Sequence, residues 1–469
     1  SFCTLLASRA VGMYGSAGST SHHAETEESP PASSPYHLTV AGVIMVALVS
    51  TVGTGVLSLP HACHQGSLFP TLVAIAALGA ASAVAMYYTG LASGLHRTVS
   101  YAEVSTVAIF GPDTHPGAAR AEGSPRPAED GKASWLPMDV AEAGSSDDHL
   151  LVSRRRESER ARRRQQQRLI IEFFIDVLTN TSNIVGTVPA VRTVADLGTH
   201  LARHCGAARG SILASTWPYY VVSFAVLLPI GAMRTLEELA IVNLLGVGTV
   251  LVVLAGIIFE YAYTRGGEGL ATNQDRDHIH WFALNDGVVV MALLVLSALV
   301  MHNILPQLAT ELKGFRPSVF KRIAGITTIA TCACYVAAGV FGYLTFGRAV
   351  SFEKADGSIV NNYPNNLGWT VLRSLLLIHF ICSTPVWIVN TRVSVCEMYA
   401  RLRAGTDDER TIGDVVFHQP LRWRLAQSVV LNGVIVAIAA AAPSIAVVMA
   451  WAGAIMGPLV VFLVPAGIA

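Results

Sequence analysis

The sequence is short of charge. Only 14% of its 469 residues are Asp, Glu, Lys or Arg, whereas a soluble domain carries about 25%. The shortage is uneven, because 23 of the 64 charged residues lie between His96 and Arg168. The remainder are too few to cover the surfaces of the two or three soluble domains that such a length would form. The composition therefore excludes a multidomain soluble protein, and a net charge of zero argues against a nucleic-acid partner held by bulk charge.

Common catalytic and metal-binding patterns are also absent. The seven cysteines form no CxxC pair, and neither HExxH, GxSxG nor a paired intramembrane aspartate motif occurs. We therefore expect no enzyme, no metal site and no cofactor. Cys63 and Cys205 lie between predicted helices on the same side of the membrane, which leaves a disulfide between them open.

Apolar sequence is what the chain has in abundance. Ten stretches approach the roughly 20 residues that a helix needs to cross a bilayer. They cover 38–62, 68–94, 169–191, 214–233, 239–260, 283–309, 320–345, 368–396, 425–442 and 444–469. Leu, Ala, Val and Ile dominate them without the alternation of barrel strands, so the backbone in lipid must be helical. The predicted fold class is an all-α, polytopic membrane protein.

Basic residues are distributed unequally between the predicted loops. With a cytosolic N-terminus, 23 Lys and Arg fall on the cytosolic side and seven on the other, which supports that orientation. Residues 1–37 are expected to be a disordered cytosolic tail, and 112–167 a low-complexity cytosolic loop that interrupts a transmembrane domain spanning 38–469. The basic run Arg154–Arg168 is either a positive-inside anchor or a site for anionic lipids, worth about 1 kcal/mol per basic residue.

The first apolar segment is unsuited to a continuous helix. Two glycines alternate with hydroxyl residues in Thr51-Val52-Gly53-Thr54-Gly55, and Pro60 follows. Glycine exposes the backbone and proline removes a donor, so an unwound segment here would offer free N–H groups to a carboxylate. Thr51, Gly53, Thr54 and Gly55 are then substrate-binding candidates. The alternative is close helix packing through small side chains.

The sixth segment has a corresponding interruption. It runs from Ser297 into His302-Asn303-Ile304-Leu305-Pro306. Interruptions in segments one and six, five helices apart, indicate an inverted repeat with a site near the middle of the membrane. Ser297 and Asn303 therefore join the substrate-binding candidates.

Three polar residues inside predicted helices are candidates for ion or proton coupling. Asp176 lies deep in the third helix on the face of Glu172 and Asn180, His302 titrates near neutrality, and Ser383 could offer a hydroxyl to an ion. Each also has a structural interpretation. Asp176 could be half of an ion pair, and His302 a hydrogen-bonded core histidine. The Ser383 hydroxyl could satisfy a backbone group at the kink caused by Pro385.

Together the motifs resemble those of the amino acid/auxin permeases, a eukaryotic amino-acid transporter family of the APC-type superfamily. The matching runs are Gly53–Ala62 in the first helix, Asn303–Pro306 with Glu311–Lys313 in the sixth, Gly342–Gly347 in the seventh, and Pro443–Ile445, Gly453–Ile455 and Phe462–Ala466 in the ninth and tenth. Their order and spacing agree with the family over about residues 38–469, except for the insertion at 112–167.

The resemblance implies a five-plus-five inverted-repeat transporter with broken helices one and six and alternating access. It implies eleven helices, of which ten are present, so the sequence is expected to be a fragment with a truncated C-terminus. Sodium-coupled members have an asparagine where this chain has Val49, which makes Na⁺ less expected than H⁺ coupling or facilitated transport.

We therefore expect a transmembrane amino-acid transporter, secondary active by proton symport or facilitative, with neutral amino acids slightly preferred. It would reside in the plasma membrane or a vacuolar/lysosomal membrane. Two alternatives stay open: an amino-acid-sensing receptor without net transport, and a transporter of cationic amino acids.

Overall fold

The computed structural model describes most of the predicted membrane domain. The described residues are 38–96, 98, 100–110, 146–208, 210–264, 266–272, 279–351, 358–404, 419–442, 445–463 and 465–466. The predicted tail at 1–37 and residues 112–145 of the predicted loop lie outside these ranges.

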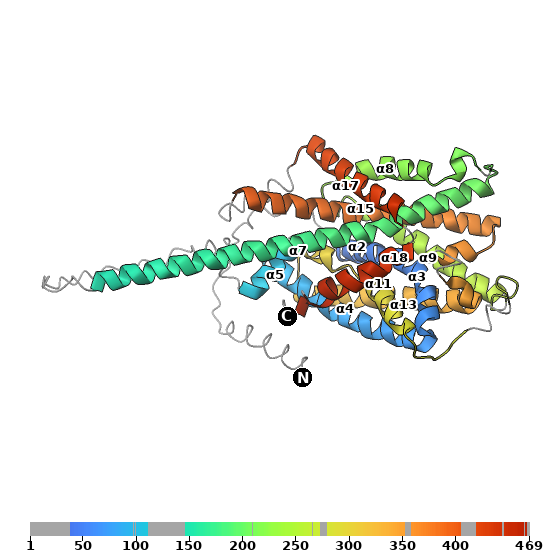
Figure 1. The fold of residues 1–469 in the computed structure, drawn as a ribbon, viewed down its shortest axis with the longest axis horizontal. Helices are drawn as coiled ribbons and strands as arrows, with labels where there is room; N and C mark the ends of the chain where they lie inside the picture. The colour runs from blue at the N-terminus through green and yellow to red at the C-terminus, as the bar shows by residue number, and fades with distance from the viewer. Residues whose placement is uncertain are drawn as a thin grey trace.

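The described chain is built from α-helices, as predicted. They are α2 (Val40–Thr51), α3 (Thr54–Gly66), α4 (Leu68–His96), α5 (Tyr101–Phe110), α7 (Ser146–His204), α8 (Trp217–Gly231), α9 (Ala240–Tyr263), α11 (Gly287–Ala298), α12 (Leu305–Glu311), α13 (Pro317–Phe346), α15 (Leu367–Ala404), α17 (Leu421–Ala441) and α18 (Ile445–Trp451). A π-helical stretch follows α18 over Ala452–Met456 and Pro458–Leu463. Most of these helices run along a common direction in one bundle (Figure 1).

The lengths and surfaces of the helices fit a membrane protein. Seven described helices are long and apolar enough to cross a bilayer, and the bent pair α2–α3 makes an eighth. Two shorter apolar helices, Trp217–Gly231 and Val447–Leu463, occupy the two other predicted segments. Large apolar side chains also point outward, among them Ile241, Ile329 and Phe174, which are 83%, 73% and 66% exposed. Such a surface suits lipid rather than water.

Helix α7 is much longer than hydropathy predicts. It runs through 59 residues from Ser146, although the apolar segment begins only at Leu169. The segment 112–167 expected as a loop is therefore helical from Ser146 onward. Its Arg, Glu and Gln side chains are good helix formers that a hydropathy scan does not register. The first part of α7 projects beyond the bundle (Figure 1), and we call the end of the bundle from which it extends the projecting end.

A short helix that hydropathy does not reveal, α5, packs against α7 near the projecting end. Thr106 Oγ1 donates to Glu172 Oε1 at 2.6 Å, and the same carboxylate accepts from Arg168 Nε at 2.8 Å. The Tyr101 hydroxyl donates to the Val460 carbonyl oxygen at 2.6 Å. Glu172 thus joins α5 to α7, and Tyr101 joins α5 to the π-helical stretch.

Both predicted helix breaks are present. α2 ends at Thr51 and α3 begins at Thr54, and the two axes differ by 50°. α11 ends at Ala298, and a single 3₁₀ turn at His302–Ile304 precedes α12. Glycine at the first break, and proline after the 3₁₀ turn at the second break, explain why neither segment continues as a regular helix.

The cysteines considered for a disulfide do not form one. Cys63 is buried and Cys205 is exposed, and both are free thiols, as are the other described cysteines. Packing between helices, rather than disulfide bonds, therefore holds the described bundle together.

Candidate functional site

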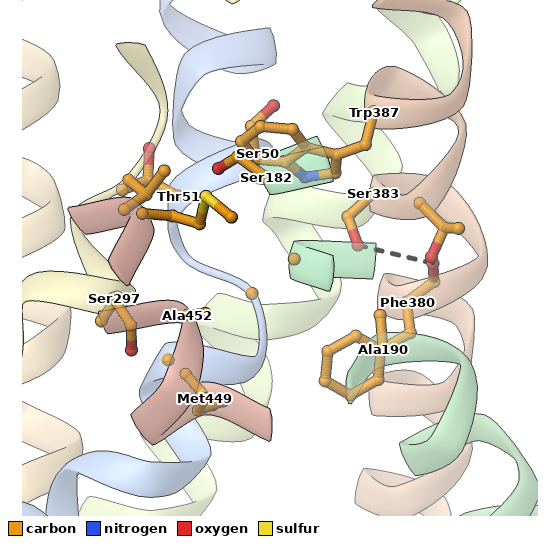
Figure 2. A pocket seen from close by; sticks show the side chains of 17 residues that line it. Ser50, Thr51, Ser182, Ala190, Ser297, Phe380, Ser383, Trp387, Met449 and Ala452 are labelled. Carbon is orange, nitrogen blue, oxygen red and sulfur yellow. Dashed lines mark hydrogen bonds between the residues drawn. The ribbon is translucent and has the colours of Figure 1, made fainter. Parts of the chain in front are cut away.

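The two helix breaks meet at a central cavity. About 650 Å³ of atom-free space, which includes space open to solvent, lies between the break of α2–α3, the end of α11, α7, α15, and the segment from α18 into the π-helical stretch. In Figure 2 the irregular link between α2 and α3 passes along the cavity, with Thr51 and Ser297 to one side and Ser383 and Trp387 to the other. Five separate parts of the fold therefore contribute to one site.

A single hydroxyl connects the two breaks. The Tyr335 hydroxyl of α13 lies 2.6 Å from the Thr51 carbonyl oxygen and 2.5 Å from the Ala298 carbonyl oxygen. These carbonyls belong to the last residues of α2 and α11, where helices leave acceptors unpaired. The Thr51 carbonyl also accepts from the backbone N–H of Gly53 at 2.8 Å, so each of the two acceptors has a donor and keeps a further lone pair. Two negative ends of half-helices thus converge beside the cavity.

The close approach of the breaks depends on Gly55. A β-carbon at this position would lie 2.6 Å from Ala298 Cβ and 3.2 Å from the Tyr335 hydroxyl. Gly53 is different, because the nearest atom to its hypothetical β-carbon is the Ser50 carbonyl oxygen at 4.0 Å. The contact with α11 therefore requires a residue without a β-carbon at Gly55. At Gly53 the absence of a β-carbon leaves open space.

The beginning of α3 offers the opposite polarity. The first N–H groups of an α-helix have no partner within it, and those of α3 begin at Thr54. Gly53 and Gly55 both line the cavity, so the positive end of α3 is at its wall. The side chain of Thr54 lies outside the described residues. The positive end of α3 and the negative ends of α2 and α11 thus border the same space.

Hydroxyl side chains add acceptor character to the wall. Ser50, Thr51 and Ser297 donate to carbonyls of their own helices at 2.6, 2.6 and 2.9 Å. Thr384 likewise donates to the Phe380 carbonyl oxygen at 2.6 Å. A hydroxyl whose hydrogen is used can still accept through its lone pairs. The remaining walls are apolar or aromatic, with Phe380, Trp387 and Met449 among them.

The described residues that line the cavity carry no formal charge. A bound charged group would therefore rely on backbone N–H groups, carbonyls, hydroxyls and the ends of half-helices. This arrangement is suited to a small zwitterion, whose two charges match the two polarities at the breaks. It provides no carboxylate to balance an additional positive charge on a side chain.

Most of the predicted substrate-binding residues lie together. Thr51, Gly53, Gly55 and Ser297 line the central cavity. Asn303 does not. Its amide nitrogen donates to Asn183 Oδ1 at 2.8 Å, and it borders a second, smaller chamber nearer the projecting end.

The coupling candidates are dispersed. Ser383 lines the central cavity. Asp176 is buried in α7, with 2% of its surface exposed, and lies outside the cavity wall. His302 is fully buried and has its Nε2 atom 3.3 Å from the Ser82 carbonyl oxygen in α4. The structure therefore brings one of the three to the cavity.

Several cavity residues were not anticipated from the sequence. α7 presents Ser182, Gly186 and Ala190, which follow one another at four-residue spacing. Trp387 of α15 and Met449 of α18 complete the opposite walls. The spacing in α7 is a usable signal, but small and apolar residues at that period are typical of ordinary helix packing in membranes.

Comparison with models of known protein families gives a match over most of the chain. A family model described as transmembrane amino acid transporter protein matches residues 170–468. The match covers the helices from α7 onward and leaves the first broken helix outside it. No curated protein matches the chain.

Proposed function

Because the chain belongs to the transmembrane amino acid transporter family, a family of transporters rather than enzymes, we propose that its central cavity binds a neutral amino acid and carries it across the membrane. The observation that carries this proposal is the uncharged cavity at which both helix breaks converge. Alternating access would expose the cavity to one side of the membrane at a time.

The two polarities at the breaks suggest how the substrate would be oriented. The N-terminal N–H groups of α3, near Gly53 and Gly55, would receive the carboxylate. The amino group would approach the carbonyls of Thr51 and Ala298, each of which already has one donor and keeps a second lone pair. The substrate's ammonium would donate to these remaining lone pairs.

Substrate preference follows from the lining. A neutral side chain would face Phe380, Trp387 and Met449, which are apolar or aromatic. The ammonium of lysine would enter the same space without a carboxylate, and burying an unpaired charge is costly. We therefore favour neutral over cationic substrates.

The arrangement of the breaks is consistent with a five-plus-five inverted repeat. Breaks in the first and sixth predicted segments contact each other through Gly55 and Ala298. In such a transporter the two repeats would rock about the bound substrate.

For coupling, we propose protons or no ion rather than sodium at the first helix. Val49, where sodium-coupled relatives have asparagine, packs towards Gly246, whose hypothetical β-carbon would lie 2.7 Å from Val49 Cγ2. Asp176, His302 and Ser383 remain the coupling candidates. Uptake into proteoliposomes with and without an imposed pH gradient tests this proposal, and equal initial rates in both conditions would rule out proton coupling.

We place the N-terminus and the projecting end in the cytosol, on the evidence of 23 basic residues against seven. Lipid contact would then be confined to the inner part of the basic run. Arg154 lies 14 residues from Arg168, about 21 Å along a helix, which exceeds a Debye length of about 8 Å. The exposed Arg163 and Arg164 are close enough to meet anionic headgroups in either the plasma or a vacuolar/lysosomal membrane.

The proposal is tested by uptake of all twenty amino acids into proteoliposomes that contain the purified chain. We expect saturable uptake of several neutral amino acids and loss of uptake in Gly53→Leu, which fills the space beside the break. Absence of uptake for every amino acid, by a protein that remains folded, would contradict it.

One observation favours a sensing function as the second candidate. The projecting part of α7 gives a receptor a rigid platform for a partner (Figure 1). Deleting residues 112–145, which precede this helix, distinguishes the functions. A transporter would keep its flux after the deletion, whereas a sensor would bind amino acids without flux in either form.

A further inference from the structure

The helices of the bundle pack in two groups. In the first group, α7, α8, α15 and α17 pack against one another, and in the second α2, α3, α4, α11, α12 and α13 do so. The central cavity lies between the groups, with α2–α3 and α11 on one side and α7 and α15 on the other. Access to the cavity from the projecting end therefore depends on what joins the two groups there.

A short segment between α8 and α9, residues 232–239, is fixed to the first group, and we call it the α8–α9 link. Arg424 of α17 donates through Nη1 to the Ala232 carbonyl oxygen at 2.7 Å. Arg392 of α15 donates through Nη2 to the Met233 carbonyl oxygen at 2.5 Å. Both arginines are buried, and a cation is favourable beside the carbonyls at the end of a helix. Two charged hydrogen bonds thus hold the start of the link on α15 and α17.

The rest of the link reaches the second group. Leu236 and Leu239, each 0% exposed, belong to one apolar cluster with residues of α2 and α12, among them Val46 and Leu308. The Leu236 N–H also lies 3.5 Å from Glu311 Oε1 at the end of α12, which is at the limit of hydrogen bonding. Apolar packing is therefore the main contact between the link and the two broken helices.

The two broken helices are joined to each other where they meet the link. The Leu38 N–H, just before α2, donates to the Glu311 carbonyl oxygen at 2.7 Å, and the Lys313 N–H donates to the Leu38 carbonyl oxygen at 3.0 Å. These bonds form a parallel bridge between Leu38 and Leu312. Two main-chain bonds couple α2 to α12, so a loss of contact with the link would free both helices together.

The apolar cluster separates the central cavity from the projecting end. On α2, Ala47 lies one turn before Thr51 of the cavity wall, and on α15 Val389 follows Trp387 of the wall. Ala47 and Val389 are 1% and 0% exposed. A zwitterion cannot cross a packed apolar cluster without losing its polar partners, which is costly. In this conformation the cavity is closed towards the projecting end.

We propose that the α8–α9 link is the gate of the central cavity at the projecting end, and that Leu236 and Leu239 hold α2 and α12 in the closed position. On opening, the two leucines would separate from α2 and α12, while the two arginines keep the link on the first group. This gate rests on the proposed function, because only a transporter needs to open its cavity at this end. The closure itself is measurable without transport.

The experiment measures how fast a water-soluble maleimide modifies a cysteine placed inside the apolar cluster. Ala47→Cys is the reporter, because Ala47 is buried and lies between the cavity and the projecting end. The purified full chain is used, and mass spectrometry of its peptides separates modification of the reporter from that of the native cysteines. With the link intact we expect slow modification.

Variants of the link should open the cluster. Leu236→Ala and Leu239→Ala should each accelerate modification of the reporter at least about tenfold, because truncating a buried leucine weakens its contacts by more than a factor of ten. Leu227→Ala is the matched control, since Leu227 is 2% exposed but packs in a cluster with Ile388 within the first group. It should lower the unfolding midpoint to a similar degree without faster modification. Either link variant is sufficient if the other fails to fold.

Two results would overturn the proposal. If the reporter reacts as fast with the link intact as in the unfolded chain, the cluster does not close the cavity. If the folded link variants react no faster than Leu227→Ala, the link is not the gate. Modification that depends on the link, together with no uptake of any amino acid, would support the closure and refute the proposed function alone.

Discussion

Replacement of Gly55 by alanine is the sharpest perturbation of the contact between the two broken helices. The added β-carbon would lie 2.6 Å from Ala298 Cβ and 3.1 Å from Ala298 Cα. Carbon atoms pack at about 3.5–4.0 Å, so α3 and the end of α11 must separate by about 1 Å. Such a shift would also move at least one carbonyl away from the Tyr335 hydroxyl, which now lies 2.6 and 2.5 Å from Thr51 and Ala298.

The magnitude follows from the cost of overpacking. An extra methyl group in a well-packed interior costs about 1–3 kcal/mol. At about 1.4 kcal/mol per factor of ten, conformations in which the breaks touch would be disfavoured roughly 5- to 150-fold. If transport passes through these conformations, the initial rate of uptake should fall by a similar factor.

The assay compares Gly55→Ala with Gly433→Ala of α17 in proteoliposomes, at equal amounts of folded protein. The hypothetical β-carbon of Gly433 has no atom within 4 Å, and this residue is outside the cavity lining. We expect this control to keep most of the uptake. Uptake by Gly55→Ala at the rate of the unmodified chain would refute the view that contact between the breaks is needed for transport.

Three further predictions concern single contacts. Tyr335→Phe removes the hydroxyl shared by two buried carbonyls, so we expect a loss of about 1–3 kcal/mol in the free energy of unfolding and slower uptake; an unchanged unfolding midpoint would contradict this. Gly186→Leu enters open space at the cavity wall, since no atom lies within 4 Å of its hypothetical β-carbon, and competition assays should show weaker binding of large neutral amino acids than of alanine. Glu172→Gln removes the negative charge that the buried Arg168 contacts at 2.8 Å and should cost about 3–5 kcal/mol in unfolding experiments, whereas Arg163→Gln on the exposed side should cost almost nothing.

Much of the fold was predictable because membrane helices must satisfy their backbones internally. Apolar length predicted the seven long helices and the bent pair α2–α3, glycine with proline marked the first break, and Pro306 marked the second. The long start of α7 was missed because its sequence is highly charged, and a hydropathy scan detects only apolar helices. Helix α5 was missed because it is short and is held by tertiary contacts of Thr106 and Tyr101 rather than by its own apolar length.

The candidate site was predictable where backbone chemistry determines it. Gly53, Gly55 and Ser297 lie at the cavity because chain interruptions create unpaired groups there. In α7 the polar face of Asp176 and Asn180 was the visible signal, but the cavity is lined by the neighbouring face that carries Ser182 and Gly186. Polarity marks a buried residue, and only the packing of α7 against its neighbours determines which buried face borders open space.

The most direct test of the central claim compares two amino acids that have the same four-carbon side chain. L-norleucine and L-lysine differ mainly in the terminal ammonium of lysine, and the cavity's described lining has no carboxylate to receive it. Measured in proteoliposomes containing the purified chain, saturable uptake of norleucine should exceed that of lysine by at least about tenfold, since an unpaired buried charge costs more than 1.4 kcal/mol. Equal uptake of the two, or faster uptake of lysine, would contradict the assignment of this cavity to neutral amino acids.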